Sequence, residues 1–311
     1  MDLFLATILI SLISLWAMIV GFRLGQRSPA RSLLAVQISV LMVSGVYFVF
    51  VWNRPLLTQY LPHTALIVLA NWHPLMGSFF AGMYLASRRI GRLRRLIIGP
   101  GTLLLAGYSI LAPVLGRAPV CEPSQANGPL ISQTTPYTCS AAAAASLLQL
   151  HGIAATESEM AELCLTRDGT HWMGVYRGLK MMTQESAWDV VVQPFSREAV
   201  MMLNESPAVL SININTDLIN TSEDHGFCGH AGHSVLALGS RGNIEVMVFD
   251  PAPAYGIECW NEELLSWVSG GVILRLVSRY GPECNAPVRM RISQATRKYD
   301  EVAYVNWHAQ L

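Results

Sequence analysis

The chain has 311 residues, of which 52% are hydrophobic and only 14% are charged, and its formal net charge is zero. Soluble domains carry about 25% charged residues, so this composition indicates a membrane region. The absence of a long basic segment argues against nucleic acid as the main partner. Because the hydrophobic excess is concentrated in the first third, we expect a membrane region followed by a globular domain.

Four apolar stretches precede residue 118, and each is close to the ~20 residues with which a helix crosses a bilayer. They cover residues 3–22, 33–52, 64–87 and 96–116. Arginines occur between the first and second stretches and between the third and fourth. Since positively charged loops stay in the cytoplasm, we expect an integral membrane protein of the cell membrane, with the N-terminus and everything after the fourth stretch on the extracytoplasmic side.

The sequence divides into four parts. Residues 1–118 are the membrane region, and residues 119–131 are a linker broken by proline and glycine. Residues 132–281 have the composition of a soluble domain, and the tail 282–311 has no assigned role. Within the soluble domain, helical patterns come first and strand patterns follow, which predicts the α+β class.

The most informative stretch of the soluble domain ends at Cys139, which is followed by Ser140 and five consecutive alanines. Alanine is the best helix former, so this run predicts a helix with Cys139 in its first turn. Thr138 or Ser140 can cap that helix, and Gly152 can end it. The positive end of the helix dipole favours a thiolate, which makes Cys139 a candidate nucleophile.

Gln133 lies six residues before Cys139, across a turn-prone Thr-Thr-Pro segment. A side-chain amide at this distance can direct a donor at the oxygen of a carbonyl that the sulfur attacks. Gln133 is therefore a candidate oxyanion donor.

A predicted hairpin supplies the remaining candidates. Residues 234–239 and 244–249 are apolar and β-branched, and a Ser-Arg-Gly-Asn turn joins them. A tight hairpin centred between residues 241 and 242 pairs His233 directly with Asp250, at a Cβ separation of about 4.5–5.5 Å. If this end of the hairpin faces the Cys139 helix, the three residues form a nucleophile, a base and its orienting carboxylate.

Together these residues resemble a papain-like cysteine peptidase, and more narrowly the bacteriocin-processing, double-glycine-leader peptidase family. The resemblance covers about residues 131–277 and rests on the order Gln133, Cys139, His233 and Asp250. It implies a papain-like domain in which the nucleophile helix packs on an antiparallel sheet, behind a bundle of four transmembrane helices. It also implies a peptide or protein substrate, Cys139 as the nucleophile, His233 as general base and acid, Asp250 as its orienting partner, Gln133 at the oxyanion hole, and neither a metal nor an organic cofactor.

Three features depart from that family. Thr138 and Ser140 flank the nucleophile, where an acidic residue and a glycine are usual. The chain has no phosphate-binding loop, and the peptidase-like domain follows the apolar stretches. These features predict a membrane-anchored peptidase that acts on an exported or membrane-proximal peptide, rather than the processing domain of an ATP-driven exporter.

Two alternatives remain open at this point. The first is a metal-dependent hydrolase, because His225, Cys228, His230 and His233 are closely spaced side chains of the type that bind zinc. The second is a domain of the same fold that binds peptides without cleaving them, on the same membrane anchor. Outside the cytoplasm, the six cysteines can also form disulfides, and Cys259 with Cys284 is a plausible pair by position.

Overall fold

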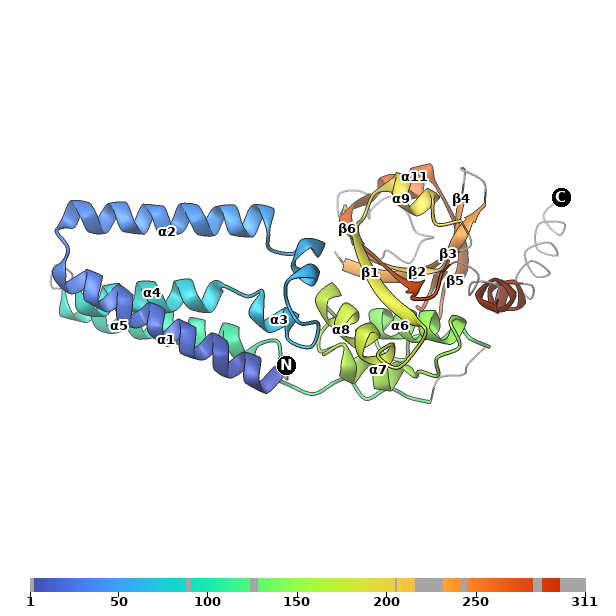
Figure 1. Cartoon of the computed structure of the whole chain (residues 1–311), viewed down its shortest axis with the longest axis horizontal. Coiled ribbons are helices and arrows are strands. Elements are labelled where there is room, and N and C mark those ends of the chain that lie inside the picture. The colour runs from blue at the N-terminus through green and yellow to red at the C-terminus, as the bar shows by residue number, and fades with distance from the viewer. Residues whose placement is uncertain are drawn as a thin grey trace. The chain divides into compact units, whose positions relative to one another are not determined.

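The structure is a computed structural model that describes residues 3–87, 91–123, 128–204, 206–215, 232–241, 245–281 and 287–296. The chain forms two compact units, Met1–Leu115 and Gly116–Leu311. The first unit is helical, and the second combines helices with an antiparallel sheet (Figure 1).

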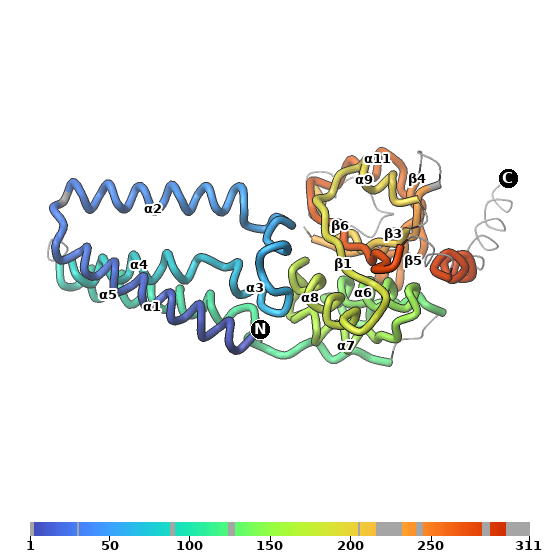
Figure 2. Tube along the Cα trace, in the orientation of Figure 1, coloured from blue at the N-terminus to red at the C-terminus, as the bar shows by residue number. Residues whose placement is uncertain are grey.

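The first unit consists of long helices that run roughly along one direction (Figure 2). They are α1 (Leu3–Arg27), α2 (Ala30–Phe50), α3 (Leu66–Leu69), α4 (His73–Ala86) and α5 (Arg92–Leu111), with a 3-10 turn, η1, at Pro55–Gln59.

Small residues bring α1 and α4 into close contact. A Cβ atom on Gly21 would collide with the carbonyl oxygen of Phe79, and one on Gly82 would collide with that of Met18. Glycine at these positions lets the two backbones approach each other, as is common between helices in membranes. This packing is the main contact that joins the N-terminal helix to the rest of the unit.

Three helical stretches in the described part of the chain are long and apolar enough to cross a membrane, namely Leu3–Arg27, Arg31–Phe50 and Leu66–Ala86. The fourth expected span corresponds to α5, which is not among them, because its first turn carries several arginines and its interior contains Pro100.

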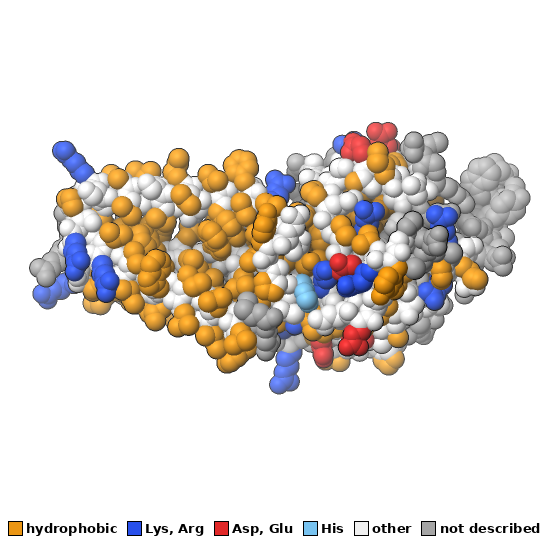
Figure 3. Space-filling model, in the orientation of Figure 1, with side chains coloured by type: hydrophobic (Ala, Val, Ile, Leu, Met, Phe, Trp, Pro, Cys, Tyr) orange, Lys and Arg blue, Asp and Glu red, His pale blue; other side chains and the backbone are white. Residues whose placement is uncertain are grey.

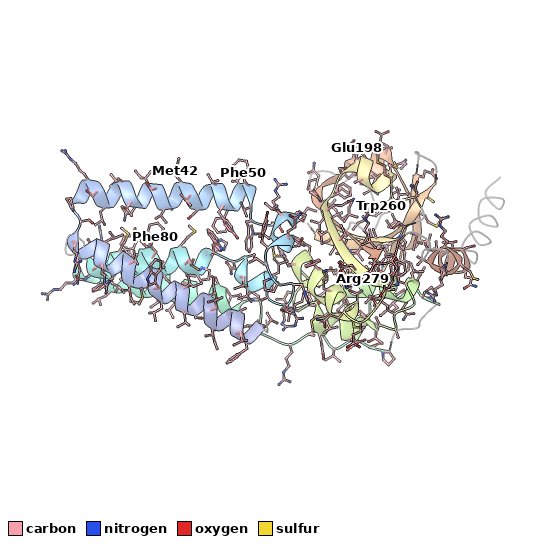
Figure 4. All side chains as sticks on the ribbon, in the orientation of Figure 1. Met42, Phe50, Phe80, Glu198, Trp260 and Arg279 are labelled. Carbon is pink, nitrogen blue, oxygen red and sulfur yellow. The ribbon has the colours of Figure 1, made fainter. Side chains whose placement is uncertain are left out.

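The first unit exposes many large hydrophobic side chains. Met42 and Phe50 point outward from α2 (Figure 4), and each is 66% exposed. Hydrophobic side chains cover the visible face of the helices, and basic side chains gather at the end where α1 meets α2 (Figure 3). Exposed apolar area of this extent marks contact with lipid or with another protein.

The third expected span is interrupted, because residues 70–72 separate α3 from α4. Side chains satisfy the backbone and polar groups at this break. The Tyr47 hydroxyl donates to the carbonyl oxygen of Ala70 at 2.6 Å, and the Asn71 amide donates to that of Ser109 at 2.8 Å. Non-helical backbone at membrane depth needs such internal partners.

The second unit begins with three helices, continues with strands that have short helices between them, and includes a further helical stretch at residues 287–296. The helices are α6 (Cys139–Leu150), α7 (Glu157–Leu163), α8 (Trp172–Met182), α9 (Arg197–Met201) and α11 (Glu262–Ser266). The strands are β1 (Trp188–Pro194), β2 (Ala208–Ile214), β3 (Gly232–Arg241), β4 (Glu245–Asp250), β5 (Gly256–Asn261) and β6 (Val268–Ser278). Within the described residues they form one antiparallel sheet in the order β1-β6-β2-β3-β4-β5.

The sheet is curved, and helices cover both of its faces (Figure 1). One core lies between the sheet and the helices α9 and α11, and it contains Leu210, Val235 and Trp260, which points into it (Figure 4). The alternate residues Val209, Leu236 and Leu274 are also buried, on the face toward α6. Because both faces are covered, β2 reads as an apolar run rather than as an alternating strand.

The helix α6 is buried on all sides. Residues Ala141 to Ala145 are 0% exposed, and the helix contacts α7, α8, β2, β3 and β4. Methyl side chains allow so many elements to pack closely around one helix. Gly152, at a φ of 79°, ends α6 as predicted, and the N–H of Ile153 donates to the carbonyl oxygen of Leu148 at 2.9 Å.

The predicted N-terminal cap of α6 is wrong. Thr138 occupies the capping position without a side-chain bond to the helix, since its hydroxyl donates to the carbonyl oxygen of Thr135 at 3.1 Å. Ser140 bonds across to β3 instead. Neither hydroxyl group therefore caps the helix: Thr138 bonds the preceding turn, and Ser140 bonds a distant strand.

Candidate functional site

The imidazole of His233 and the carboxylate of Asp250 are in direct contact. His233 Nε2 lies 2.9 Å from Asp250 Oδ2, and the side chains are only 10% and 1% exposed. The other carboxylate oxygen, Oδ1, accepts the backbone N–H of Ala252 at 2.8 Å. Asp250 is thus held at both oxygens, and it fixes the plane of the imidazole ring while leaving Nδ1 for another partner.

The expected hairpin register is wrong by two residues. Leu236 is opposite Phe249, so the register places Asp250 level with residue 235 rather than opposite His233. The ladder is irregular between Ala237 and Gly239, where Gly239 has a φ of 155°, and Arg241 pairs with Glu245, so the connection lies later in the chain than predicted. An offset of two keeps both side chains on one face of the sheet, where diagonal neighbours can still meet.

The sulfur of Cys139 is the other partner of His233. The thiol lies in the first turn of α6 and is partly exposed, and the His233 side chain and the Ser234 backbone are close enough to lower its pKa. Residues that are 94 and more positions apart in the chain are thereby brought together. The arrangement of thiol, imidazole and carboxylate is that of a nucleophile, a base and an orienting group.

The ionisation of the Cys139 thiol and that of the His233 imidazole depend on each other. Burial opposes ionisation of the Cys139 thiol, but the hydrogen bond and charge of His233, followed by bonds from Ser234 and Ser140, leave its pKa below the ordinary value. Burial also lowers the pKa of His233, but the Asp250 hydrogen bond, the Cys139 contact and both negative charges raise it to about 10. The pair therefore favours a thiolate facing an imidazolium.

The chain is similar to solved peptidase domains. The peptidase domain of the bifunctional ABC transporter ComA from Streptococcus is 16% identical, with a TM-score of 0.38, and the match covers 48% of this chain and 96% of that one. The peptidase domain of Streptococcus mutans ComA is 17% identical, with a TM-score of 0.32 and coverages of 48% of this chain and 98% of that one. A double-glycine-motif protease from an AMS/PCAT transporter, solved in complex with the leader peptide, is 18% identical, with a TM-score of 0.37 and coverages of 52% of this chain and 99% of that one. No family model and no curated protein matches the sequence.

Gln133 lies beside the turn that precedes the thiol. Its backbone N–H donates to the carbonyl oxygen of Pro251 at 2.8 Å, which ties it to the residue after Asp250. Its Nε2 donates to the carbonyl oxygen of Thr135 at 3.0 Å, and its buried Oε1 has no hydrogen-bond partner among the residues that the structure describes. An amide nitrogen carries two N–H groups, so one donor remains for another acceptor.

Sequence reasoning gave no role to Glu157, which is 2% exposed and supports the Gln133 segment. Its two carboxylate oxygens accept the backbone N–H and the hydroxyl of Thr134, at 2.8 and 2.9 Å. The sequence marked Glu157 only as a first-turn residue of a short helix, a position that is usually solvated. Nothing in its spacing from Thr134 indicated that the two would meet.

The alternative metal site depends on residues 225, 228 and 230, which lie outside the described residues, as does Cys284 of the expected disulfide. His233, the described member of that cluster, contacts Asp250 and lies near Cys139. Cys121, Cys139 and Cys164 are free thiols. Burial raises the pKa of Cys164 to about 12, and burial with the charge of Glu157 raises that of Cys121, so of these three only Cys139 is disposed to ionise near neutral pH.

Proposed function

We propose that this chain is a membrane-anchored, papain-like cysteine peptidase in which Cys139 is the nucleophile, His233 the general base and acid, Asp250 its orienting partner and Gln133 an oxyanion donor. The observation that carries the proposal is the meeting of a thiol, an imidazole and a carboxylate from three separate elements, with both carboxylate oxygens engaged. A packing role alone would not require the His233 ring to bond both Cys139 and Asp250.

The proposed reaction follows from these contacts. The Cys139 thiolate attacks the carbonyl carbon of a peptide bond, and the negative charge passes to the carbonyl oxygen. The His233 imidazolium then donates its proton to the leaving amine as the C–N bond breaks, which leaves a thioester. Imidazole next removes a proton from water, whose hydroxide attacks the thioester carbonyl, so that the acid product departs and the thiolate re-forms.

The direct test uses the full-length protein, purified in detergent and incubated with the peptide fraction of the cells that produce it. We expect new peptide termini in the mass spectrum. Prior treatment with iodoacetamide should abolish them and EDTA should leave them unchanged, because the nucleophile is a thiol. Cleavage that EDTA blocks and iodoacetamide does not would instead support the metal-dependent alternative, and binding without new termini would support the peptide-binding alternative.

We also propose that α5 completes a four-helix membrane region and that the peptidase unit lies outside the cytoplasm. The support is the position of the arginines at Arg23, Arg27 and Arg31 and in the first turn of α5, at the same end of the helical unit. Protease added outside intact cells should then degrade the peptidase unit, and complete protection of that unit would reverse the proposed orientation.

Replacing Gln133 with alanine should lower kcat/KM by about 10²–10³, the usual loss for one oxyanion donor. The alkylation rate of Cys139 should stay close to that of the wild type, since Gln133 is proposed to act on the substrate oxygen rather than on the sulfur. Steady-state kinetics on an identified peptide measure the first quantity, and site-resolved mass spectrometry measures the second. An unchanged kcat/KM would remove Gln133 from the site.

A further inference from the structure

The residues that directly follow the proposed nucleophile and base are bonded to each other. Ser140 Oγ lies 2.8 Å from Ser234 Oγ, and the two serines are 3% and 2% exposed. One belongs to the first turn of α6 and the other to the beginning of β3. This hydrogen bond therefore joins the two elements at the point where each delivers its reactive side chain.

We propose that the Ser140–Ser234 hydrogen bond is a clamp that sets the separation between the Cys139 sulfur and the His233 imidazole. Both serines are positioning residues, because they act through their neighbours. The inference rests on the proposed function, since the separation matters only if the thiol and the imidazole react as a pair.

The chain geometry makes this coupling tight. Consecutive Cα atoms are 3.8 Å apart, so a displacement of either serine displaces the adjacent reactive residue by a similar amount. A misplacement of about 1 Å in a reacting group can lower a rate about 100-fold. Because both hydroxyl groups are buried, removal of one takes this bond from the other without exposing it to water.

The hydroxyl of Ser140 is committed to this contact instead of to its own helix. A serine at the start of a helix commonly bonds a free N–H of the first turn, but Ser140 bonds the opposite strand. Ser140 Oγ also lies 4.0 Å from Cys139 Sγ, and the backbone of Ser234 is close enough to lower the pKa of the same thiol. The clamp thus brings two donors to the thiolate in addition to holding the imidazole.

The test measures the alkylation rate of Cys139 by iodoacetamide against pH, in full-length protein, by mass spectrometry of the peptide that contains Cys139. We expect Ser140→Ala and Ser234→Ala each to raise the midpoint of this pH profile and to lower kcat/KM about 10- to 100-fold. The double variant should lose little more than the worse single variant, because both single changes break one bond. Ser234→Thr keeps a hydroxyl on a strand that tolerates β-branched residues, so it should restore most of both quantities.

Ser146→Ala is the matched control. Ser146 is buried in the same helix and bonds Ala142 and Ile131, so its loss should lower the unfolding temperature without moving the alkylation midpoint. If Ser140→Ala and Ser234→Ala behave like this control, the clamp is wrong and the proposed function stands. If wild-type Cys139 is alkylated no faster near neutral pH than an ordinary thiol, the proposed function itself fails.

Discussion

Cys139→Ala is expected to abolish peptide cleavage and the alkylation of this position, while the fold stays intact. Cys139 is the thiol proposed to form the covalent intermediate, so the loss should be complete rather than partial. Alanine continues the run that follows in α6 and is the best helix former, so the unfolding temperature should change little. Turnover of an identified peptide and thermal unfolding of the detergent-solubilised protein check the two halves of this prediction.

Two other thiols provide the control for Cys139→Ala. Cys121→Ala and Cys164→Ala should leave cleavage unchanged, because the pKa of each thiol is raised and neither contacts His233 or Asp250 in the described hydrogen bonding. Cys164 is fully buried, so its replacement should cost stability alone. Cleavage that survives in Cys139→Ala would end the assignment of the nucleophile.

His233→Ala is expected to lower kcat/KM by at least about 10²–10⁴, the range for loss of a general acid–base group. The midpoint of Cys139 alkylation should also move to higher pH, since the variant lacks the hydrogen bond and positive charge that stabilise the thiolate. An alkylation profile identical to that of the wild type would mean that the imidazole does not act on the sulfur.

The same pair predicts a bell-shaped pH profile for kcat/KM. Activity rises with pH as Cys139 ionises, below the usual range of a thiol, and falls toward about pH 10 as His233 loses its proton. Asp250→Asn removes a charge and a bond that raise the His233 pKa, so the basic limb should move to lower pH. In His151→Gln both limbs should stay in place, because burial lowers the pKa of His151 to about 4 and the ring is already neutral throughout this range.

Local sequence patterns predicted the helices and strands of the site better than they predicted which side chains bond to one another. The alanine run and Gly152 gave both ends of α6, because helix propensity and a left-handed terminal residue are properties of adjacent positions. Capping failed for the opposite reason. The hydroxyl group of Ser140 bonds a residue 94 positions away that no local rule could choose, and that of Thr138 bonds the competing local acceptor Thr135.

The hairpin illustrates how a wrong register can still predict a correct contact. The sequence pattern does not show that the ladder is irregular before Gly239 or that the connection begins after Arg241. The strand register predicted from the sequence therefore differs by two residues from the register in the structure. Because side chains alternate between the faces of a strand, an error of two left His233 and Asp250 on the same side. An error of one would have separated them.

The sequence predicted the apolar composition of the first unit but not the break in its third apolar stretch. Hydropathy identified the apolar stretches, but the break at residues 70–72 depends on the Tyr47 hydroxyl and the Asn71 side chain, which satisfy backbone groups from positions distant in the chain. Hydropathy averages over a window and therefore does not detect such partners.

The alanines of α6 have a consequence for how substrates can differ. A methyl group has no rotamers, so the helix that carries the sulfur has no side-chain adjustment with which to follow a bulkier or slimmer peptide. The five buried methyl groups therefore keep this helix in one fixed position. If the proposed function holds, differences in peptide specificity must come from residues outside this helix whose side chains can change conformation. Directed evolution toward new peptides should therefore select substitutions at those residues and leave Ala141 to Ala145 unchanged.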